Sequence, residues 1–268
     1  MTSVLNQKPE IAVLFHLART GGTLISKCLG CIGGNVLLSE VNPEGSVMHP
    51  LLQAYNWHGL FTADELQPYL DKNASRPDYL ETIRFIHRKT LQLSQKLIVR
   101  DWSHLNFTGV PYTTRPCGQA LQHEVLSRTF SVHAFATVRH PLDTYLSLSR
   151  LQVVQGKLTV KSYLAGCKQF ALFAAKTGFV RYEDFCREPQ RRLQEICQAL
   201  SVHYQEDFLH KFHAYQYITG DTIGKHGQSD AIAMPKRRQL DPTTEKAFQD
   251  SGDYHEILQL LGYRHELT

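Results

Sequence analysis

The stretch from Ile11 to Gly30 constrains the fold more than any other part of the chain. Residues 11–15 form an uninterrupted apolar run, which is typical of a strand buried on both faces of a parallel sheet. A short loop with two adjacent glycines follows, and residues 24–29 have the apolar spacing of a helix. A strand, a glycine loop and a helix in this order predict an α/β fold.

The glycine loop also predicts a site for a phosphate or sulfate group. The first N–H groups of a helix have no partner within the helix, and the helix dipole makes that end partly positive. Gly21 and Gly22 let the backbone fold around an anion, Arg19 adds a cation, and Thr20 and Thr23 add hydroxyl donors. The ATP-binding pattern GxxxxGK[ST] is not met, because no lysine precedes Thr23. An ordinary glycine turn fits the same residues.

The remaining chain alternates between predicted strands and helices. Apolar runs predict strands at residues 35–41, 96–102, 131–139 and 178–182, and helical spacing predicts helices at 77–95, 160–176, 189–200 and 245–261. We therefore expect a single α/β domain over residues 1–268, with helices flanking a mainly parallel sheet of about five strands. Residues 44–68 are rich in Gly, Pro, His and aromatic residues, which predicts a loop-rich segment that binds an acceptor or packs on the surface.

Composition indicates a globular protein, and its mildly basic balance is compatible with anionic ligands. Of the 268 residues, 42% are hydrophobic and 20% charged, and the net charge of +4 is too small to indicate nucleic-acid binding. The sequence shows no signal peptide and no run near the roughly 18 apolar residues of a membrane span. We therefore expect a cytoplasmic protein with reduced cysteines and no integral membrane association. No Cys/His spacing or acidic cluster predicts a metal site.

The ends of the predicted strands carry the candidate ligand-binding residues. In parallel sheets, ligands bind beyond the carboxyl ends of the strands. Here those ends carry Arg19, Glu40, residues 100–104 and Arg139. Three of these four ends supply a cation or a histidine, so we expect a site for a multiply anionic ligand.

Three motifs at these positions resemble those of the sulfotransferase family, which uses 3′-phosphoadenosine 5′-phosphosulfate (PAPS). Residues 19–23, RTGGT, resemble the loop for the 5′-phosphosulfate. Arg139, followed eight residues later by Ser147, resembles the 3′-phosphate motif, and residues 181–185, RYEDF, resemble the R-Y-E-D-L segment. An ion pair with Asp143 or another carboxylate at the strand end is the structural alternative for Arg139. The resemblance implies a P-loop-like fold of three layers and transfer of a sulfuryl group from PAPS to a hydroxyl or amine.

The resemblance also implies roles for individual residues. Family members often carry a catalytic histidine after a strand, and here that residue is His104, the expected general base. Asp101 is the substitute base or orients the imidazole, and Arg100 stabilises the leaving phosphate. Arg19 holds the transferred group. A C-terminal segment, residues 220–240, is expected to close the nucleotide site through Lys225, with residues 236–238 in reserve. The family mechanism needs no metal.

The acceptor is not identified by the sequence. Four aromatic residues suggest an aromatic-walled pocket for a small-molecule, carbohydrate or lipid acceptor: Tyr55, Trp57, Phe61 and Trp102. Two alternative functions remain open, a P-loop kinase that uses ATP and Mg²⁺, and a nucleotide-binding module without catalysis. No sequence pattern predicts an oligomeric state.

Overall fold

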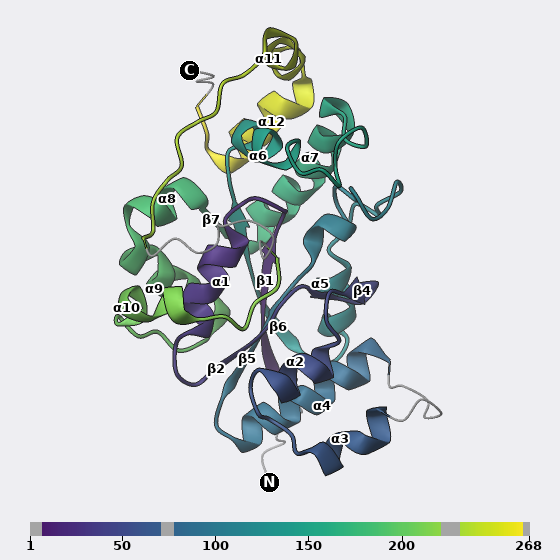
Figure 1. Cartoon of the computed structure of the whole chain (residues 1–268), viewed down its shortest axis with the longest axis vertical. Helices are drawn as coiled ribbons and strands as arrows, with labels where there is room; N and C mark the ends of the chain where they lie inside the picture. Colours follow the sequence, from purple (N-terminus) through teal and green to yellow (C-terminus); the bar gives the residue numbers. More distant parts are fainter. Residues whose placement is uncertain (1–6, 71–77, 221–230, 265–268) are drawn as a thin grey trace.

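A parallel five-stranded sheet forms the centre of the molecule (Figure 1). The computed structural model describes residues 7–70, 78–220 and 231–264. The strand order is β2-β5-β1-β6-β7, and each neighbouring pair is parallel. The strands are β1 (Glu10–His16), β2 (Asn35–Leu38), β5 (Lys96–Arg100), β6 (Ser131–Val138) and β7 (Phe179–Arg181). A separate antiparallel pair joins β3 (Val41–Asn42) and β4 (Gly45–Ser46). The predicted parallel α/β sheet is confirmed.

Helices pack on both faces of this sheet. The described helices are α1 (Gly22–Gly30), α2 (Pro50–Asn56), α3 (Ala63–Leu70), α4 (Tyr79–Gln92), α5 (Leu121–Ser127), α6 (Pro141–Leu148), α7 (Val160–Thr177), α8 (Tyr182–Arg187), α9 (Pro189–Leu200), α10 (Phe208–Lys211), α11 (Pro242–Gln249) and α12 (Gly252–Leu261), with 3₁₀ turns η1 (Ser103–Leu105) and η2 (Phe212–Ala214). None of them is both long and apolar enough to cross a bilayer.

Side chains of β1 alternate between two apolar clusters, one on each face of the sheet. Val13 and Phe15 belong to the cluster that includes residues of α4, α7 and α12. Ala12 and Leu14 belong to the cluster that includes residues of α1 and α9. Successive side chains of a strand point to opposite faces, so β1 is covered on both sides. This confirms the three-layer arrangement and explains why its sequence is continuously apolar.

The prediction of a loop-rich segment at residues 44–68 is wrong, because the segment contains α2 and most of α3. Both helices begin at local caps. Pro50 occupies the first turn of α2, and His49 Nδ1 accepts a hydrogen bond from the backbone N–H of Leu51. Thr62 and Glu65 exchange backbone and side-chain hydrogen bonds at the start of α3. Helices this short carry too little apolar periodicity to stand out in the sequence.

Two other predicted boundaries also differ from the structure. The predicted strand at residues 35–41 ends at Leu38, because Glu40 has a φ of 51° and turns the chain. The predicted helix at residues 245–261 is two helices, α11 and α12. The break falls at Ser251, whose hydroxyl caps α12 by accepting from the backbone N–H of Tyr254.

Candidate active site

The loop between β1 and α1 leaves no room for side chains at its two glycines. Gly21 has a φ of 85°, and a Cβ there would lie 2.1 Å from Cδ2 of Tyr182. A Cβ on Gly22 would lie 2.1 Å from Cδ2 of His16. Two rings therefore pack directly against the backbone at the start of α1. Only glycine fits both positions in this geometry.

The hydroxyl groups predicted to bind an anion have partners within the protein. Thr20 donates from Oγ1 to the carbonyl oxygen of Leu17 at 2.8 Å, so this hydroxyl holds the loop together. Thr23 Oγ1 accepts from Nη2 of Arg100 at 3.4 Å. Its own proton is not used in that bond and can be donated to a ligand.

Several arginines lie close together, one of them in contact with Ser147, and we call Arg19, Arg139, Arg150 and Arg238 the arginine cluster. Arg19 donates from Nε to Ser147 Oγ at 2.9 Å, and Arg139 donates from Nη1 to the carbonyl oxygen of Arg19 at 3.2 Å. Arg238 donates to the carbonyl oxygen of Leu146. Burial and the charges of the other three arginines lower the pKa of Arg238. Like charges this close repel one another, and a bound anion relieves that repulsion.

Asp143 does not neutralise this cluster. Its carboxylate accepts two hydrogen bonds from Arg237, at 3.0 and 3.2 Å. The guanidinium of Arg139 instead lies 5.2 Å from the centroid of the Tyr182 ring. Arg139 forms no ion pair with any residue in ranges 7–70, 78–220 and 231–264. The structural alternative for Arg139, an ion pair with Asp143 or another carboxylate, is therefore not found among the described residues.

The stretch that follows residue 230 brings Arg238 to the cluster. Residues 231–241 run without helix or strand past α8 to α11 (Figure 1). The Tyr182 hydroxyl donates to the carbonyl oxygen of Ala233 at 3.4 Å. Tyr182 thus contacts this stretch as well as Gly21 and Arg139. Lys225, the cation predicted to close the site, lies outside the described residues.

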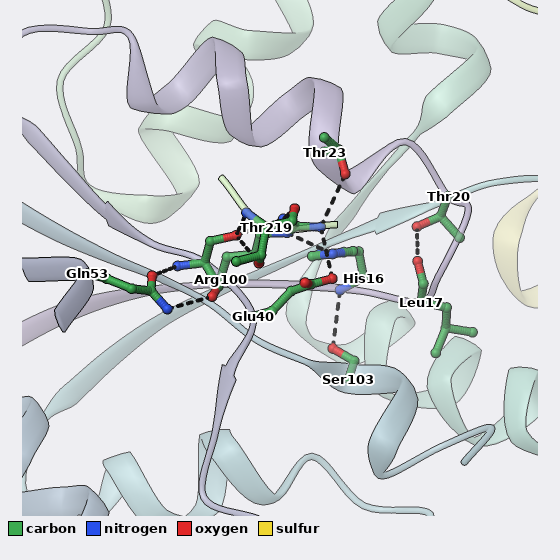
Figure 2. A network of polar contacts seen from close by, with 10 residues as sticks. His16, Leu17, Thr20, Thr23, Glu40, Gln53, Arg100, Ser103 and Thr219 are labelled. Atoms are coloured by element: carbon green, nitrogen blue, oxygen red, sulfur yellow. Dashed lines mark hydrogen bonds and ion pairs between the residues drawn. The ribbon is translucent and has the colours of Figure 1, made fainter. Parts of the chain in front are cut away.

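Arg100 is the centre of a second, buried group of polar side chains (Figure 2). Arg100 as a whole is only 2% exposed. It donates to His16 Nε2, Ser39 Oγ and the carbonyl oxygen of Thr219, each at 2.9 Å. Nη2 lies 3.5 Å from Glu40 Oε1 and donates to the Thr23 hydroxyl. Arg100 therefore connects the ends of β1, β2 and β5 with the start of α1.

Glu40 is held in this group by the corner at the end of β2. The side chain of Gln53 hydrogen bonds both backbone groups of Ser39, accepting from its N–H at 2.6 Å and donating to its carbonyl oxygen at 2.9 Å (Figure 2). This fixes the chain just before Glu40, the residue with positive φ. The Glu40 carboxylate is thereby directed toward Arg100.

Asp101 is enclosed by neighbours that do not include the ring of His104. Its oxygens accept from Asn42 Nδ2 at 2.8 Å and from Ser103 Oγ at 2.6 Å. The residue is 1% exposed, and burial raises the pKa of its carboxyl group to about 7. Among the described residues, the His104 ring is not a hydrogen-bond partner of Asp101. Asp101 orients Ser103 and Asn42, and its burial argues against the role of substitute base.

His104 lies at the edge of this group, beside two aromatic rings. Its ring centroid is 5.5 Å from that of Trp102 and 5.6 Å from that of Tyr112. Burial and the charge of Arg100, opposed by the nearby Glu40 charge, lower the pKa of His104 to about 4. The imidazole is therefore neutral at pH 7 and can accept a proton.

The predicted aromatic wall is only partly present at the site. Trp102 packs against Tyr112, with ring centroids 4.8 Å apart, and Tyr112 is 58% exposed. Phe61 is buried and stacks on Phe85 at 4.7 Å, so it belongs to the core. Tyr55 also packs against the core. Trp102 and Tyr112 therefore form the aromatic surface next to His104.

We expect the stability of an Asp101→Asn variant to diverge from that of the wild type as pH rises. The folded-state pKa of Asp101, about 7, lies above its ordinary value of 3.8, so the folded protein binds this proton more tightly. The carboxyl group therefore favours folding below pH 4, and this contribution is lost as pH rises through 7. Urea unfolding at pH 4 to 8 should show the variant gaining up to a few kcal/mol relative to wild type. A stability difference that does not change with pH would contradict this.

Sequence reasoning missed the role of His16 and assigned none to Glu40. The signal for Glu40 was its position at a predicted strand end. His16 is the last residue of β1, where a buried polar side chain ends an apolar run. Arg238 was only a second choice for closing the nucleotide site, because its neighbours in space lie far from it in the sequence.

The fold and site together define an α/β protein with a glycine loop and, beside it, a cluster of arginines. No protein-family model matches the chain, and no curated protein matches it in sequence. Among solved structures, the sulfotransferase domain from the curacin biosynthetic pathway matches with a TM-score of 0.64 and 14% identity, covering 96% of this chain and 99% of that one. The sulfotransferase domain of the Synechococcus PCC 7002 olefin synthase matches with a TM-score of 0.61 and 17% identity, covering 99% of both chains. The chain has the sulfotransferase fold.

Proposed function

We propose that this protein is a sulfotransferase that moves a sulfuryl group from PAPS to a hydroxyl or amine of an acceptor. The observation that carries the proposal is the arginine cluster, one member of which contacts Ser147, beside a helix that begins at a glycine loop. PAPS has two separate anionic groups, a 3′-phosphate and a 5′-phosphosulfate. Arg139, Arg150 and Arg238 of the cluster suit the first, and Arg19 together with the start of α1 suits the second.

The chain's own residues supply charge and position for an in-line transfer. Arg139, Ser147 and Arg238 bind the 3′-phosphate, which distinguishes PAPS from ATP. Arg19, Thr23 and the N–H groups at the start of α1 hold the sulfuryl group and the leaving 5′-phosphate. As in phosphoryl transfer, positioning and charge neutralisation provide most of the catalysis. No metal takes part in the proposed mechanism.

His104 is the proposed general base, because its neutral imidazole lies next to the aromatic surface. Glu40 is the second candidate for the base, since its carboxylate belongs to the buried polar group around Arg100 and pairs with that arginine. The proposed acceptor is a small molecule, carbohydrate or lipid that carries the reacting hydroxyl or amine and contacts Trp102 and Tyr112.

The proposal is tested by thermal-shift titration with adenosine 3′,5′-bisphosphate (PAP), beside AMP and ATP–Mg²⁺. We expect PAP to stabilise the wild type, and Arg139→Ala to weaken PAP binding by about 10- to 100-fold, because a charge-assisted pair to phosphate is lost. Arg84→Ala is the control, since this α4 arginine pairs with Glu81 on the helix surface. A PAP affinity within about twofold of wild type in Arg139→Ala contradicts the assignment.

The two alternative functions give different results in this titration and in an assay of transfer from PAPS. Stabilisation by ATP–Mg²⁺ and not by PAP indicates a kinase. Binding of PAP without transfer from PAPS to any phenol, sterol, sugar or amine indicates a nucleotide-binding module that has lost catalysis.

A further inference from the structure

His16 is a buried histidine at the end of β1 whose ring contacts Arg100 and Gly22. It is 4% exposed, and its Nε2 accepts a hydrogen bond from Nε of Arg100 at 2.9 Å. Its ring carbon Cδ2 packs against the backbone of Gly22, where a Cβ would lie 2.1 Å away. His16 therefore touches both the first residue of α1 and the buried guanidinium.

The hydrogen bond from Arg100 determines the protonation state of His16. Arginine can only donate, so Nε2 must carry a lone pair, and the proton of the neutral ring is on Nδ1. Burial and the charge of Arg100 lower the pKa of His16 well below its usual range, with a smaller contribution from His104. His16 is thus an acceptor at neutral pH and does not serve as an acid.

The remaining N–H groups of Arg100 join parts of the chain that are distant in sequence. Nη1 donates to Ser39 Oγ and to the carbonyl oxygen of Thr219. Nη2 faces Thr23 Oγ1 and Glu40. A guanidinium is planar and rigid, so the atom that accepts from Nε determines where Nη1 and Nη2 point.

We propose that His16 is a positioning residue, which accepts from Nε of Arg100 and thereby fixes the orientation of the guanidinium toward Thr23 and Glu40. This inference rests on the proposed function, because Thr23 and Glu40 belong to the proposed transfer site. His16 acts through Arg100 and contacts no substrate. Its ring also packs against Gly22 in the first turn of α1.

The same orientation holds Thr219 and Gly220. Thr219 donates its N–H to Ser39 Oγ at 3.0 Å while its carbonyl oxygen accepts from Arg100. A Cβ on Gly220 would lie 3.3 Å from Thr23 Oγ1 and 3.4 Å from Glu40 Oε1. Residues 219 and 220 therefore lie beside the start of α1, and a turned guanidinium releases their contact.

Two substitutions separate the acceptor role from packing. His16→Gln keeps an acceptor oxygen that can reach Nε of Arg100, whereas His16→Leu keeps the volume and removes the acceptor. His87→Leu is the control, because His87 is likewise buried (5% exposed) and its Nε2 donates one hydrogen bond to the Glu10 carbonyl oxygen, at the opposite end of the sheet. All three variants lose a buried histidine, and only one loses the Arg100 contact.

Hydrogen exchange of the segment over residues 212–220 provides a readout that does not depend on activity. We expect this segment to exchange about 10-fold faster or more in His16→Leu, and at the wild-type rate in His16→Gln and His87→Leu. A spectrum of ¹⁵N-histidine-labelled wild type at pH 7 should show His16 with its proton on Nδ1. A proton on Nε2, or equal exchange in His16→Leu and wild type, overturns the inference.

Transfer kinetics complete the test with any acceptor found by the PAPS screen. We expect kcat to fall about 10- to 100-fold in His16→Leu with the PAP affinity kept within about threefold, and His16→Gln to recover most of the loss. If His16→Gln is as slow as His16→Leu, packing against Gly22 explains the effect and the acceptor role is wrong. If wild type does not bind PAP, the proposed function fails, while the exchange and tautomer data still decide the role of His16.

Discussion

A Gly21→Ala variant is expected to lose PAP binding by about 100-fold or more while the sheet stays folded. Two costs act at this position. A residue with a side chain at φ 85° carries left-handed strain of about 1–2 kcal/mol. Its Cβ would also lie 2.1 Å from the Tyr182 ring, so either the ring or the loop must move, at about 1–3 kcal/mol. Both movements displace the proposed anion site, because Tyr182 also contacts Arg139.

Gly59→Ala is the matched control for this substitution. Gly59 has a φ of 58°, and an added Cβ meets nothing within 4 Å. It therefore carries the backbone strain without the collision. The melting temperature reports the backbone strain in both variants. The PAP affinity reports the effect of the collision with the Tyr182 ring. In Gly21→Ala/Tyr182→Ala the collision is removed, and we expect part of the affinity to return. Equal PAP affinity in Gly21→Ala and Gly59→Ala would contradict a packing requirement at Gly21.

The sequence was sufficient where local pattern determines structure. The apolar run at residues 11–15 identified the central strand, because β1 is covered on both faces. The positions of Arg139 and Ser147 at a strand end and on the next helix also followed from the sequence. Residue types at predicted strand ends therefore gave a sound estimate of where polar groups would gather.

Partners that are distant in sequence could not be predicted. Asp101 was considered as a base because it is a carboxylate beside His104, but Asn42, 59 positions away, encloses it instead. Arg238 contacts the backbone 92 positions away, at Leu146, and joins the arginine cluster only in the fold. No spacing rule relates such positions, since tertiary packing brings them together. The short helices α2 and α3 were not predicted for a different reason: caps rather than apolar periodicity define them.

Replacing His104 by alanine is expected to lower kcat by about 10²- to 10⁴-fold, the range that a positioned general base contributes. PAP affinity should stay within about twofold, because His104 lies with Trp102 and Tyr112, away from the arginine cluster. The measurement is the initial rate of sulfuryl transfer from labelled PAPS to the acceptor that reacts best in the screen. Tyr112→Phe is the control, since it keeps the ring beside His104 and removes only a hydroxyl.

The pH dependence tests a neutral imidazole as the base, and a second variant separates it from the carboxylate of Glu40. Because burial lowers the pKa of His104 to about 4, catalysis through this imidazole keeps its rate from pH 8 down to about 5 and falls as pH approaches 4. Glu40→Gln separates the two candidates, since it removes a carboxylate but keeps the size of the side chain. If Glu40→Gln loses the rate and His104→Ala does not, the carboxylate paired with Arg100 is the base. The imidazole then serves only to form the acceptor surface with Trp102 and Tyr112, and the proposed chemistry shifts from histidine to carboxylate within the same site.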